Sequence, residues 1–456
     1  MSAGAQGPSE GRQAMYARSS RLITTASLAA AAVIGPSAAF PASAGSSIDA
    51  ADTAWMISAT GLVLMMSIPG LALFYCGMVR KKNVLATMAQ TLLCVCVGSL
   101  LWVVACYSLT FSGGGPLIGT LDRVLFLGIG ADTTSPLAPT IPELLFAAYQ
   151  MTFAAITVAL VAGSVVDRMR FSAFVCFAVL WLPVVYVPLA HWVWGNGWLM
   201  QAGLLDFAGG TVVHLNAGVA GLVAACVVGK RSGYGSENLS PYDLSLAVIG
   251  TGLLWVGWFG FNGGSALAVG SRAVFAIVAT HLAASAGAVT WMVLEWWIRG
   301  KPSVLGMISG AVAGLGTITP ASGYVLPWHG IVIGVIAGAV CFWACTKLKQ
   351  AFKYDDSLDV FGVHGIGGAI GTLLAGVFAT ASVSINADTP AGYSGLLDGN
   401  PGQLLIQFYG IAATAVWSGV ATFLLLKLIG FVIPIRVGKE SEFEGLDLSQ
   451  HGEALQ

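Results

Sequence analysis

Long apolar runs alternate with short polar connections along most of the chain. A helix needs about 20 apolar residues to cross a bilayer, and the runs approach or exceed this length. We therefore predict an all-α integral membrane protein with eleven transmembrane helices. The predicted spans are residues 54–78, 84–112, 140–165, 171–192, 207–229, 242–264, 272–297, 303–318, 328–350, 361–381 and 402–432.

The basic residues of the connections fall almost entirely on one side of the predicted membrane. Only Arg123 and Arg272 fall on the other side. Because Lys and Arg collect in cytoplasmic loops, this asymmetry predicts an outer N-terminus and a cytoplasmic C-terminus, as an odd number of spans requires. The residues on the basic side are Arg80, Lys81, Lys82, Arg168, Arg170, Lys230, Arg231, Arg299, Lys301, Lys347, Lys349, Lys353, Lys427, Arg436 and Lys439.

Composition agrees with a membrane protein. Hydrophobic residues make up 56% of the chain and charged residues 9%, whereas a soluble domain has about 25% charged residues. The net charge of −1 gives no sign of nucleic-acid binding. The eight cysteines lie inside apolar runs, so we interpret them as small packing residues. We expect no disulfides, metal site or cofactor.

The first 44 residues are typical of a cleaved export signal. A positive segment precedes a short apolar stretch, 22–34, and an Ala-Ser-Ala cleavage site at 42–44. The alternative is an additional span retained in the mature protein, but the apolar stretch is short for that role. The predicted domains are therefore a signal peptide at 1–44, a membrane domain at 45–432 and an acidic cytoplasmic regulatory tail at 433–456.

The predicted spans divide into two halves. Spans one to five and six to ten form equal sets with an odd number of members, so the second half is inverted relative to the first. The eleventh span is then an addition. Helix breakers interrupt several spans, including Pro69-Gly70, Pro183 and the glycine-rich segment 257–265. Such breaks are tolerated where protein or a cavity satisfies the backbone, and inverted repeats commonly hold a substrate path between them.

Two histidines occupy matching contexts in these halves. DFAGGTVVHLNAGVAGL contains His214 and DVFGVHGIGGAIGTLLAG contains His364, and both read H-x-x-[A/G]-G-x-x-G. A titratable group at bilayer depth is costly and indicates function. A single such histidine is more simply a helix–helix hydrogen bond, and a pair could also ligate haem. The matched contexts favour one site built from both halves, with stacked rings that line a narrow path.

An acid and a set of aromatic residues form the remaining candidates. Asp206 precedes Ala-Gly-Gly at the outer end of the fifth span, where it could cap a helix or attract a cation. Aromatic rings attract cations across their faces, although rings at such positions also commonly face lipid. The aromatic candidates and the neighbouring hydroxyl are Tyr149, Phe153, Trp194, Phe261 and Ser265.

Several long motifs together resemble the ammonium transporters of the Amt/MEP group, within the Amt/Rh superfamily. They are PGLALFYCGMVRKKNVL, DRMRFSAF, DFAGGTVVHLNAG, GWFGFNGGSA, DVFGVHGIGG and EGLDLSQHGE, in the expected order over about residues 50–456. The resemblance implies that His214 and His364 are twin pore histidines and that Phe153 and Phe261 form a phenyl gate. It assigns ammonium recruitment to Trp194, Ser265, Phe153 and Tyr149, and gives Asp206 a structural and electrostatic role.

The resemblance also implies a bacterial type of transporter in the inner membrane. The expected assembly is a homotrimer in the lipid bilayer, with a P-II-type signalling protein as the cytoplasmic partner. Tyr149 stands where bacterial relatives often have Phe, so it adds a hydroxyl to the gate. No phosphate-binding loop for ATP hydrolysis is present, and we predict a transporter and not an enzyme. The alternatives are an ammonium sensor of the same fold, an Rh-like channel for neutral gas, and a haem protein.

Overall fold

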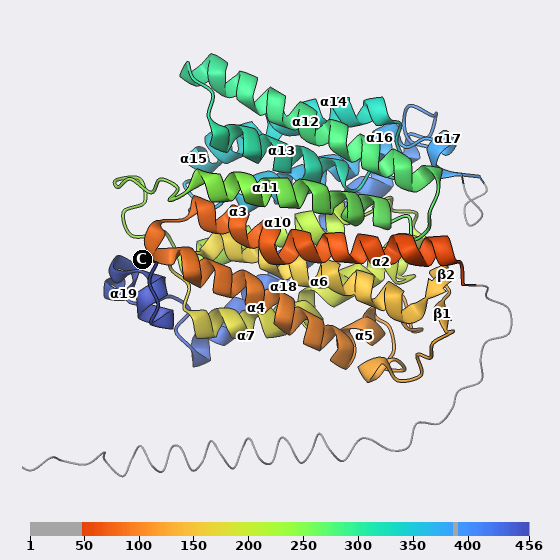
Figure 1. Ribbon diagram of the computed structural model, residues 1–456, viewed down its shortest axis with the longest axis horizontal. Helices are drawn as coiled ribbons and strands as arrows, with labels where there is room; N and C mark the ends of the chain where they lie inside the picture. Colours follow the sequence, from red (N-terminus) through yellow and green to blue (C-terminus); the bar gives the residue numbers. More distant parts are fainter. Residues whose placement is uncertain (1–47, 386–390, 456) are drawn as a thin grey trace, which may run out of the picture. The chain divides into compact units, whose positions relative to one another are not determined.

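The computed structural model describes residues 48–385 and 391–455. The predicted signal peptide, 1–44, lies outside these residues and stays a prediction. The described chain is mainly a bundle of long helices that run side by side (Figure 1). A small antiparallel hairpin, β1 (Thr134–Ser135) and β2 (Ala138–Pro142), lies at one end of the bundle, and α19 (Lys439–Glu444) lies at the other (Figure 1).

The helices of the first half follow the predicted spans closely. They are α2 (Ala50–Met65), α3 (Leu71–Met78), α4 (Val84–Leu101), α5 (Tyr107–Phe111), α6 (Glu143–Val165), α7 (Phe171–Trp181), α8 (Val187–Trp194), α9 (Trp198–Gln201) and α10 (Asn216–Val228). Those of the remaining chain are α11 (Leu244–Trp258), α12 (Ser271–Arg299), α13 (Val304–Ile318), α14 (Pro327–Trp343), α15 (Lys349–Phe352), α16 (Gly367–Phe378), α17 (Ala381–Ser384) and α18 (Gly402–Val432).

The predicted fold class is confirmed. Within residues 48–385 and 391–455, ten continuous helical stretches are long and apolar enough to cross a membrane. The remaining predicted span, 303–318, forms α13, a shorter apolar helix of 15 residues. The count of eleven spans therefore stays a prediction.

The helix breakers of the sequence coincide with π-helical turns, in which one extra residue widens the helix. Pro69 lies in the turn Met66–Gly70 and Pro183 in the turn Leu182–Tyr186. The two histidines also lie in such turns, which lead directly into α10 and α16. The matching sequence contexts therefore adopt matching local structures.

Small residues allow the two halves to approach at the backbone. A side-chain carbon added at Gly218 of α10 would lie 2.2 Å from the backbone of Gly365, and one added at Gly368 of α16 would lie 2.6 Å from the carbonyl oxygen of Gly210. Membrane helices depend on such close contacts because lipid supplies no hydrophobic drive for helices to associate. These glycines bring the turns that carry the histidines together.

Replacing Gly218 with alanine is expected to lower the free energy of unfolding by about 1–3 kcal/mol, because the new methyl group forces the two backbones apart. Gly252 in α11 is a matched control, since an added side-chain carbon there meets no atom within 4 Å. Alanine at Gly252 should raise stability by about 0.5–1 kcal/mol through helix propensity. Thermal unfolding of both variants in one detergent measures the difference in stability. Equal effects would contradict the close backbone contact at Gly218 as the cause.

Helix α18 connects both halves through buried polar groups. The Gln407 amide nitrogen donates to the carbonyl oxygens of Leu205 and Thr372, both at 2.7 Å, and its oxygen accepts from the Leu205 N–H at 2.8 Å. The Ser418 hydroxyl donates to the Asn216 carbonyl oxygen at 2.8 Å. The sequence predicts this helix as an addition to the repeats, and in the structure its side chains form hydrogen bonds with both of them.

The segment after α18 packs against the start of α4. The Asp447 carboxylate accepts from the Ala86 N–H at 2.8 Å, and the Leu446 N–H donates to the side-chain oxygen of Asn83 at 2.8 Å. Glu442 pairs with Arg436 at 2.7 Å. Burial acts to raise the pKa of Glu442, but the hydrogen bonds from Arg436 and Ser232 and the charge of Arg436 together outweigh it and hold the pKa below its ordinary value. The tail is therefore anchored by specific contacts.

Candidate functional site

Asp206 lies in the turn that precedes the His214 segment, and its carboxylate caps that segment. One oxygen accepts from the N–H groups of Gly209 at 2.8 Å and Gly210 at 2.6 Å. The other accepts from the Thr211 N–H at 2.7 Å and from the Thr211 hydroxyl. Gly209 has a φ of 113°, which favours glycine. Both oxygens are thus occupied by the protein itself, so the carboxylate holds the turn and supplies a negative field.

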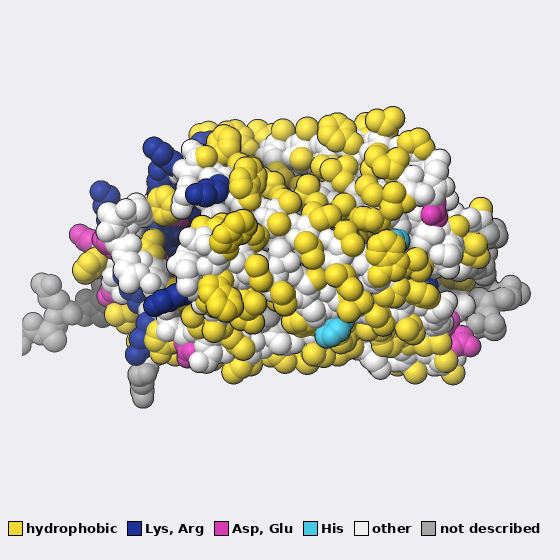
Figure 2. All heavy atoms as spheres, turned by 90° about the horizontal axis from the view of Figure 1, so that it is seen from above, with side chains coloured by type: hydrophobic (Ala, Val, Ile, Leu, Met, Phe, Trp, Pro, Cys, Tyr) yellow, Lys and Arg dark blue, Asp and Glu magenta, His cyan; other side chains and the backbone are white. Residues whose placement is uncertain are grey.

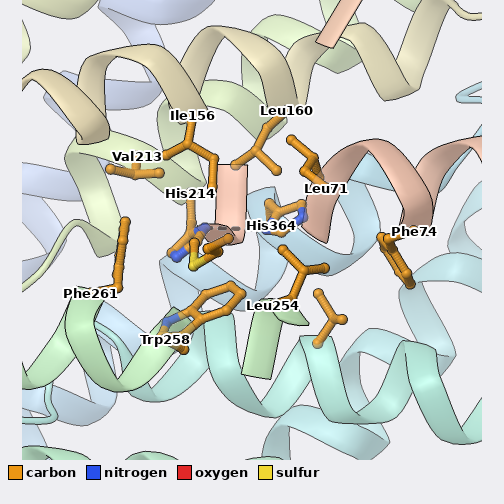
Figure 3. Close-up of a pocket in the computed structure, with 12 residues that line it drawn as sticks. Leu71, Phe74, Ile156, Leu160, Val213, His214, Leu254, Trp258, Phe261 and His364 are labelled. Atoms are coloured by element: carbon orange, nitrogen blue, oxygen red, sulfur yellow. Dashed lines mark hydrogen bonds between the residues drawn. The ribbon is translucent and has the colours of Figure 1, made fainter. Parts of the chain in front are cut away.

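The two histidines meet in the interior. Their Nδ1 atoms are 3.2 Å apart, and their rings lie 15° from parallel with centroids 5.2 Å apart (Figure 3). Because both partners are Nδ1 atoms, one ring donates and the other accepts, so the two neutral rings carry opposite tautomers. His214 Nε2 has no hydrogen-bond partner within the described chain. The two rings of the pair therefore differ, because one carries its proton on Nδ1 and the other on Nε2.

A narrow cavity surrounds the pair. Its volume is about 10 Å³, close to the smallest space that holds a water molecule. Apolar side chains form nearly all of its wall, with the histidines as its polar members (Figure 3). Labelled wall residues include Leu71, Ile156, Leu160, Val213, Leu254 and Trp258. The cavity suits a very small, uncharged molecule that can form hydrogen bonds.

A stack of two phenyl rings closes one side of the histidine pair. Phe153 and Phe261 lie 20° from parallel with centroids 4.2 Å apart, and both are buried. The Phe261 centroid is 6.1 Å from that of His214. Beyond the stack, Trp194 meets Phe153 edge-on at 5.7 Å. The rings form a continuous series from the partly exposed Trp194 to His364.

Two hydroxyl groups form hydrogen bonds with the backbone that carries one ring of this stack. The Tyr149 hydroxyl donates to the carbonyl oxygen of Phe261, at 2.7 Å, or of Gly260, at 2.9 Å. Ser265 donates to the same Phe261 oxygen at 2.8 Å and is partly exposed. The hydroxyl that distinguishes Tyr149 from phenylalanine therefore forms hydrogen bonds with the backbone of the π-helical turn Phe259–Gly263, which carries the ring of Phe261.

The structure adds residues that the sequence reasoning missed. Trp258 stacks on His214 at 5.4 Å and donates its indole N–H to the Thr319 hydroxyl at 2.8 Å. The sequence signal that could have identified Trp258 is its position three residues before Phe261, in the glycine-rich motif. A second cavity of about 250 Å³ reaches His364 from the other side, and its wall includes Asp359 and Arg299. His364 therefore lies between a narrow cavity and a wide one.

The histidine geometry leaves no room for a haem iron between the rings. A haem iron bound by both Nδ1 atoms on opposite faces of the haem would hold them about 4 Å apart, from two bonds of about 2 Å each, whereas the two atoms are 3.2 Å apart and share a hydrogen bond. Among the described residues, no group of three or more His, Cys, Asp or Glu side chains is placed to hold a metal ion. The arrangement suits passage of a small molecule and movement of a proton.

Known proteins resemble this chain over most of its length. The sequence model of the Ammonium Transporter Family matches residues 54–455. The chain is 48% identical to an ammonium transporter of Bacillus subtilis, with 88% of this chain and 97% of that protein aligned. It is 42% identical to ammonium transporter Amt1 of Archaeoglobus fulgidus, over 88% and 98% of the two chains.

Solved structures share the fold. The crystal structure of Candida albicans Mep2 superimposes with a TM-score of 0.81 and 37% identity, covering 86% of this chain and 88% of that chain. A structure described as a sensor Amt protein superimposes with a TM-score of 0.79 and 29% identity, over 88% and 98%. With a family match over most of its length, the chain belongs to the ammonium transporter family.

Proposed function

We propose that the protein recruits ammonium at the outer aromatic site and conducts ammonia or ammonium past the twin histidines into the cytoplasm. The observation that carries this proposal is the continuous series from Trp194 through the stacked phenyl rings to the histidine pair. The family membership supports ammonium as the substrate. The geometry supports the assignment of recruitment, gating and conduction to separate parts of the series.

Recruitment requires partial replacement of the water around ammonium. A ring face within about 6 Å attracts a cation by about 0.5–2 kcal/mol, and the Ser265 oxygen adds a directional acceptor. A bare cation is very costly in an apolar cavity. Loss of a proton near the gate would leave neutral ammonia to pass the histidines, whose nitrogen atoms can form hydrogen bonds with it.

The histidine pair is suited to relay the released proton. With His214 as the Nδ1 donor, a proton binds at His214 Nε2 and the Nδ1 proton shifts to His364 Nδ1. His364 then releases the proton on its Nε2 toward the wide cavity. The tautomers have reversed after one such step, so the pair must reset before the next. Transport by this route carries net charge.

Orientation and assembly form part of the same proposal. Lys and Arg gather at one end of the molecule, beyond a broad hydrophobic band (Figure 2), and this supports a cytoplasmic location for that end under the positive-inside rule. The tail lies at the same end (Figure 1). We propose a homotrimer in a bacterial inner membrane, with a P-II-type protein as the cytoplasmic partner that contacts this end.

The similarity to the sensor Amt protein keeps ammonium sensing as a second candidate function. A sensor would report occupancy of the same outer site with little flux. An Rh-like channel would pass neutral gas and would not need the cation site at Trp194 and Ser265.

Current recording on proteoliposomes after an ammonium pulse tests these functions together. We expect an ammonium-dependent current from the wild-type protein. Ammonia flux without current would indicate the gas channel, and the absence of any flux would indicate the sensor. A pH-sensitive dye inside the vesicles measures flux independently of charge.

Replacing Tyr149 with phenylalanine is expected to leave transport within about twofold of wild type, because the ring contact with Phe153 is retained. Stability should fall by about 1–3 kcal/mol, the usual cost when buried groups lose a hydrogen bond. Transport current and thermal unfolding of the same preparation measure the two effects. A large loss of current at normal stability would show that the hydroxyl acts on the substrate.

A further inference from the structure

Arg272 stands near the outer mouth without a carboxylate partner in the described residues. It lies at the start of α12, and its guanidinium carbon is 4.9 Å from the ring centroid of Phe207 and 5.1 Å from that of Tyr324. Its Nε donates to the Gly323 carbonyl oxygen at 3.0 Å. Two aromatic rings and one carbonyl oxygen therefore hold the guanidinium in place.

Phe207 connects Arg272 to the turn that contains Asp206. Phe207 follows Asp206 directly, and its N–H donates to the Pro320 carbonyl oxygen at 3.0 Å. Its ring packs so closely on Gly323 that a side-chain carbon there would lie 2.2 Å away. Arg272 therefore contacts both the turn at 206–207 and the connection between α13 and α14, and it links the two.

That turn orients Trp194. The carbonyl oxygen of Asp206 accepts from the Trp194 indole N–H at 2.9 Å. The indole in turn meets the gate residue Phe153 edge-on. A chain of direct contacts thus leads from Arg272 through Phe207 and Asp206 to Trp194.

We propose that Arg272 is a positioning residue for ammonium recruitment: it clamps Phe207 and thereby fixes the Asp206 carbonyl that orients the Trp194 indole. The inference rests on the proposed role of Trp194 as part of the recruitment site.

Positioning and simple electrostatics predict opposite effects. If Arg272 acts only as a positive charge, its removal strengthens the attraction of ammonium and lowers the apparent KM. If it positions Trp194, its removal loosens the recruitment site and raises KM while the maximal current changes little. The direction of the KM shift therefore separates the two explanations.

The test is ammonium-dependent current from full-length protein in proteoliposomes. For Arg272→Gln we expect a rise in KM of about fivefold, the size of one lost cation–π contact, with maximal current within about twofold. Arg272→Lys keeps a cation over the rings and should recover most of the KM. Phe207→Leu removes the ring that Arg272 contacts and should raise KM by a similar factor to Arg272→Gln.

A double substitution tests whether the effect passes through Trp194. In a Trp194→Leu background, Arg272→Gln should have no further effect on KM, because coupled residues are not additive. Arg123→Gln is the matched control: it removes a positive charge predicted on the same side, from a residue paired with Glu143 at 3.2 Å, and should leave KM unchanged.

Three outcomes would overturn the inference. A fall in KM for Arg272→Gln would assign its role to charge alone, and additive effects with Trp194→Leu would exclude action through that residue. Unchanged kinetics in both Arg272→Gln and Phe207→Leu would exclude positioning. Absence of current from the wild-type protein would instead overturn the proposed function itself, which distinguishes the two failures.

Discussion

Replacement of Asp206 with alanine should abolish ammonium transport and lower the free energy of unfolding by about 3–5 kcal/mol. Hydrogen bonds to a charged group contribute about 1.5–3 kcal/mol each, and this carboxylate accepts from four consecutive N–H groups, from Gly209 to Val212, and from the Thr211 hydroxyl. Without the carboxylate, the turn before His214 loses its cap and its nearby negative charge. Transport current and thermal unfolding measure the two effects.

An intermediate variant and a control sharpen this prediction. Asp206→Asn retains the oxygen that serves Gly209 and Gly210 but replaces the acceptor of Thr211, so it should be less damaging than alanine. Asp243 caps α11, with acceptor contacts to Ser245 and Leu246, and lies away from the ring series. Asp243→Ala should cost about 0.5–2 kcal/mol with normal current. Full current from Asp206→Ala would contradict a role for the carboxylate in transport.

Removal of either His214 or His364 should reduce ammonium-dependent current at least about tenfold if the proposed relay operates. The two Nδ1 atoms share one hydrogen bond, so His214→Ala leaves His364 without its relay partner, and His364→Ala has the converse effect. A relay fails when either member is missing. The double variant should therefore lose no more current than each single variant, as expected for residues that act as a unit.

His281 provides the matched control for the histidine variants. It is also a histidine in a predicted membrane span, but it is exposed on α12 and contacts Trp255 and Phe259. His281→Ala should retain the wild-type current. A dye measurement of ammonia entry accompanies each recording, because loss of current with retained flux would show that the histidines carry the proton and not the ammonia. Normal current from both pore variants would contradict the relay.

The sequence determined the fold class because the constraint behind it is local. Each membrane span must satisfy its own backbone in lipid, so a helix follows directly from an apolar run. The predicted runs all became helical, and breakers such as Pro69 and Pro183 appeared as π-helical turns. The run predicted at 303–318 formed α13, Val304–Ile318, with nearly the predicted bounds.

The site was determined in part by the same local signals. Matching motifs around His214 and His364 indicated one site from two halves, and the small residues in those motifs are the ones that allow Gly218 to meet Gly365. The position of Asp206 before a Gly-Gly pair indicated a cap, and the carboxylate contacts have that form. The motifs and the cap depend on residues that are neighbours in the chain, whereas the contact of Gly218 with Gly365 depends on how the helices pack.

Only the tertiary structure decided which distant groups meet. The chain alone does not show that Trp258 stacks on His214, that Gln407 joins Leu205 to Thr372, or that Arg272 rests on Phe207 and Tyr324. The physical reason is that hydrogen bonds and ring contacts between helices depend on their relative rotation and separation, which many apolar sequences permit equally. The sequence by itself determined the helices and marked the histidines, whereas helix packing decided which side chains surround them and how the two rings meet.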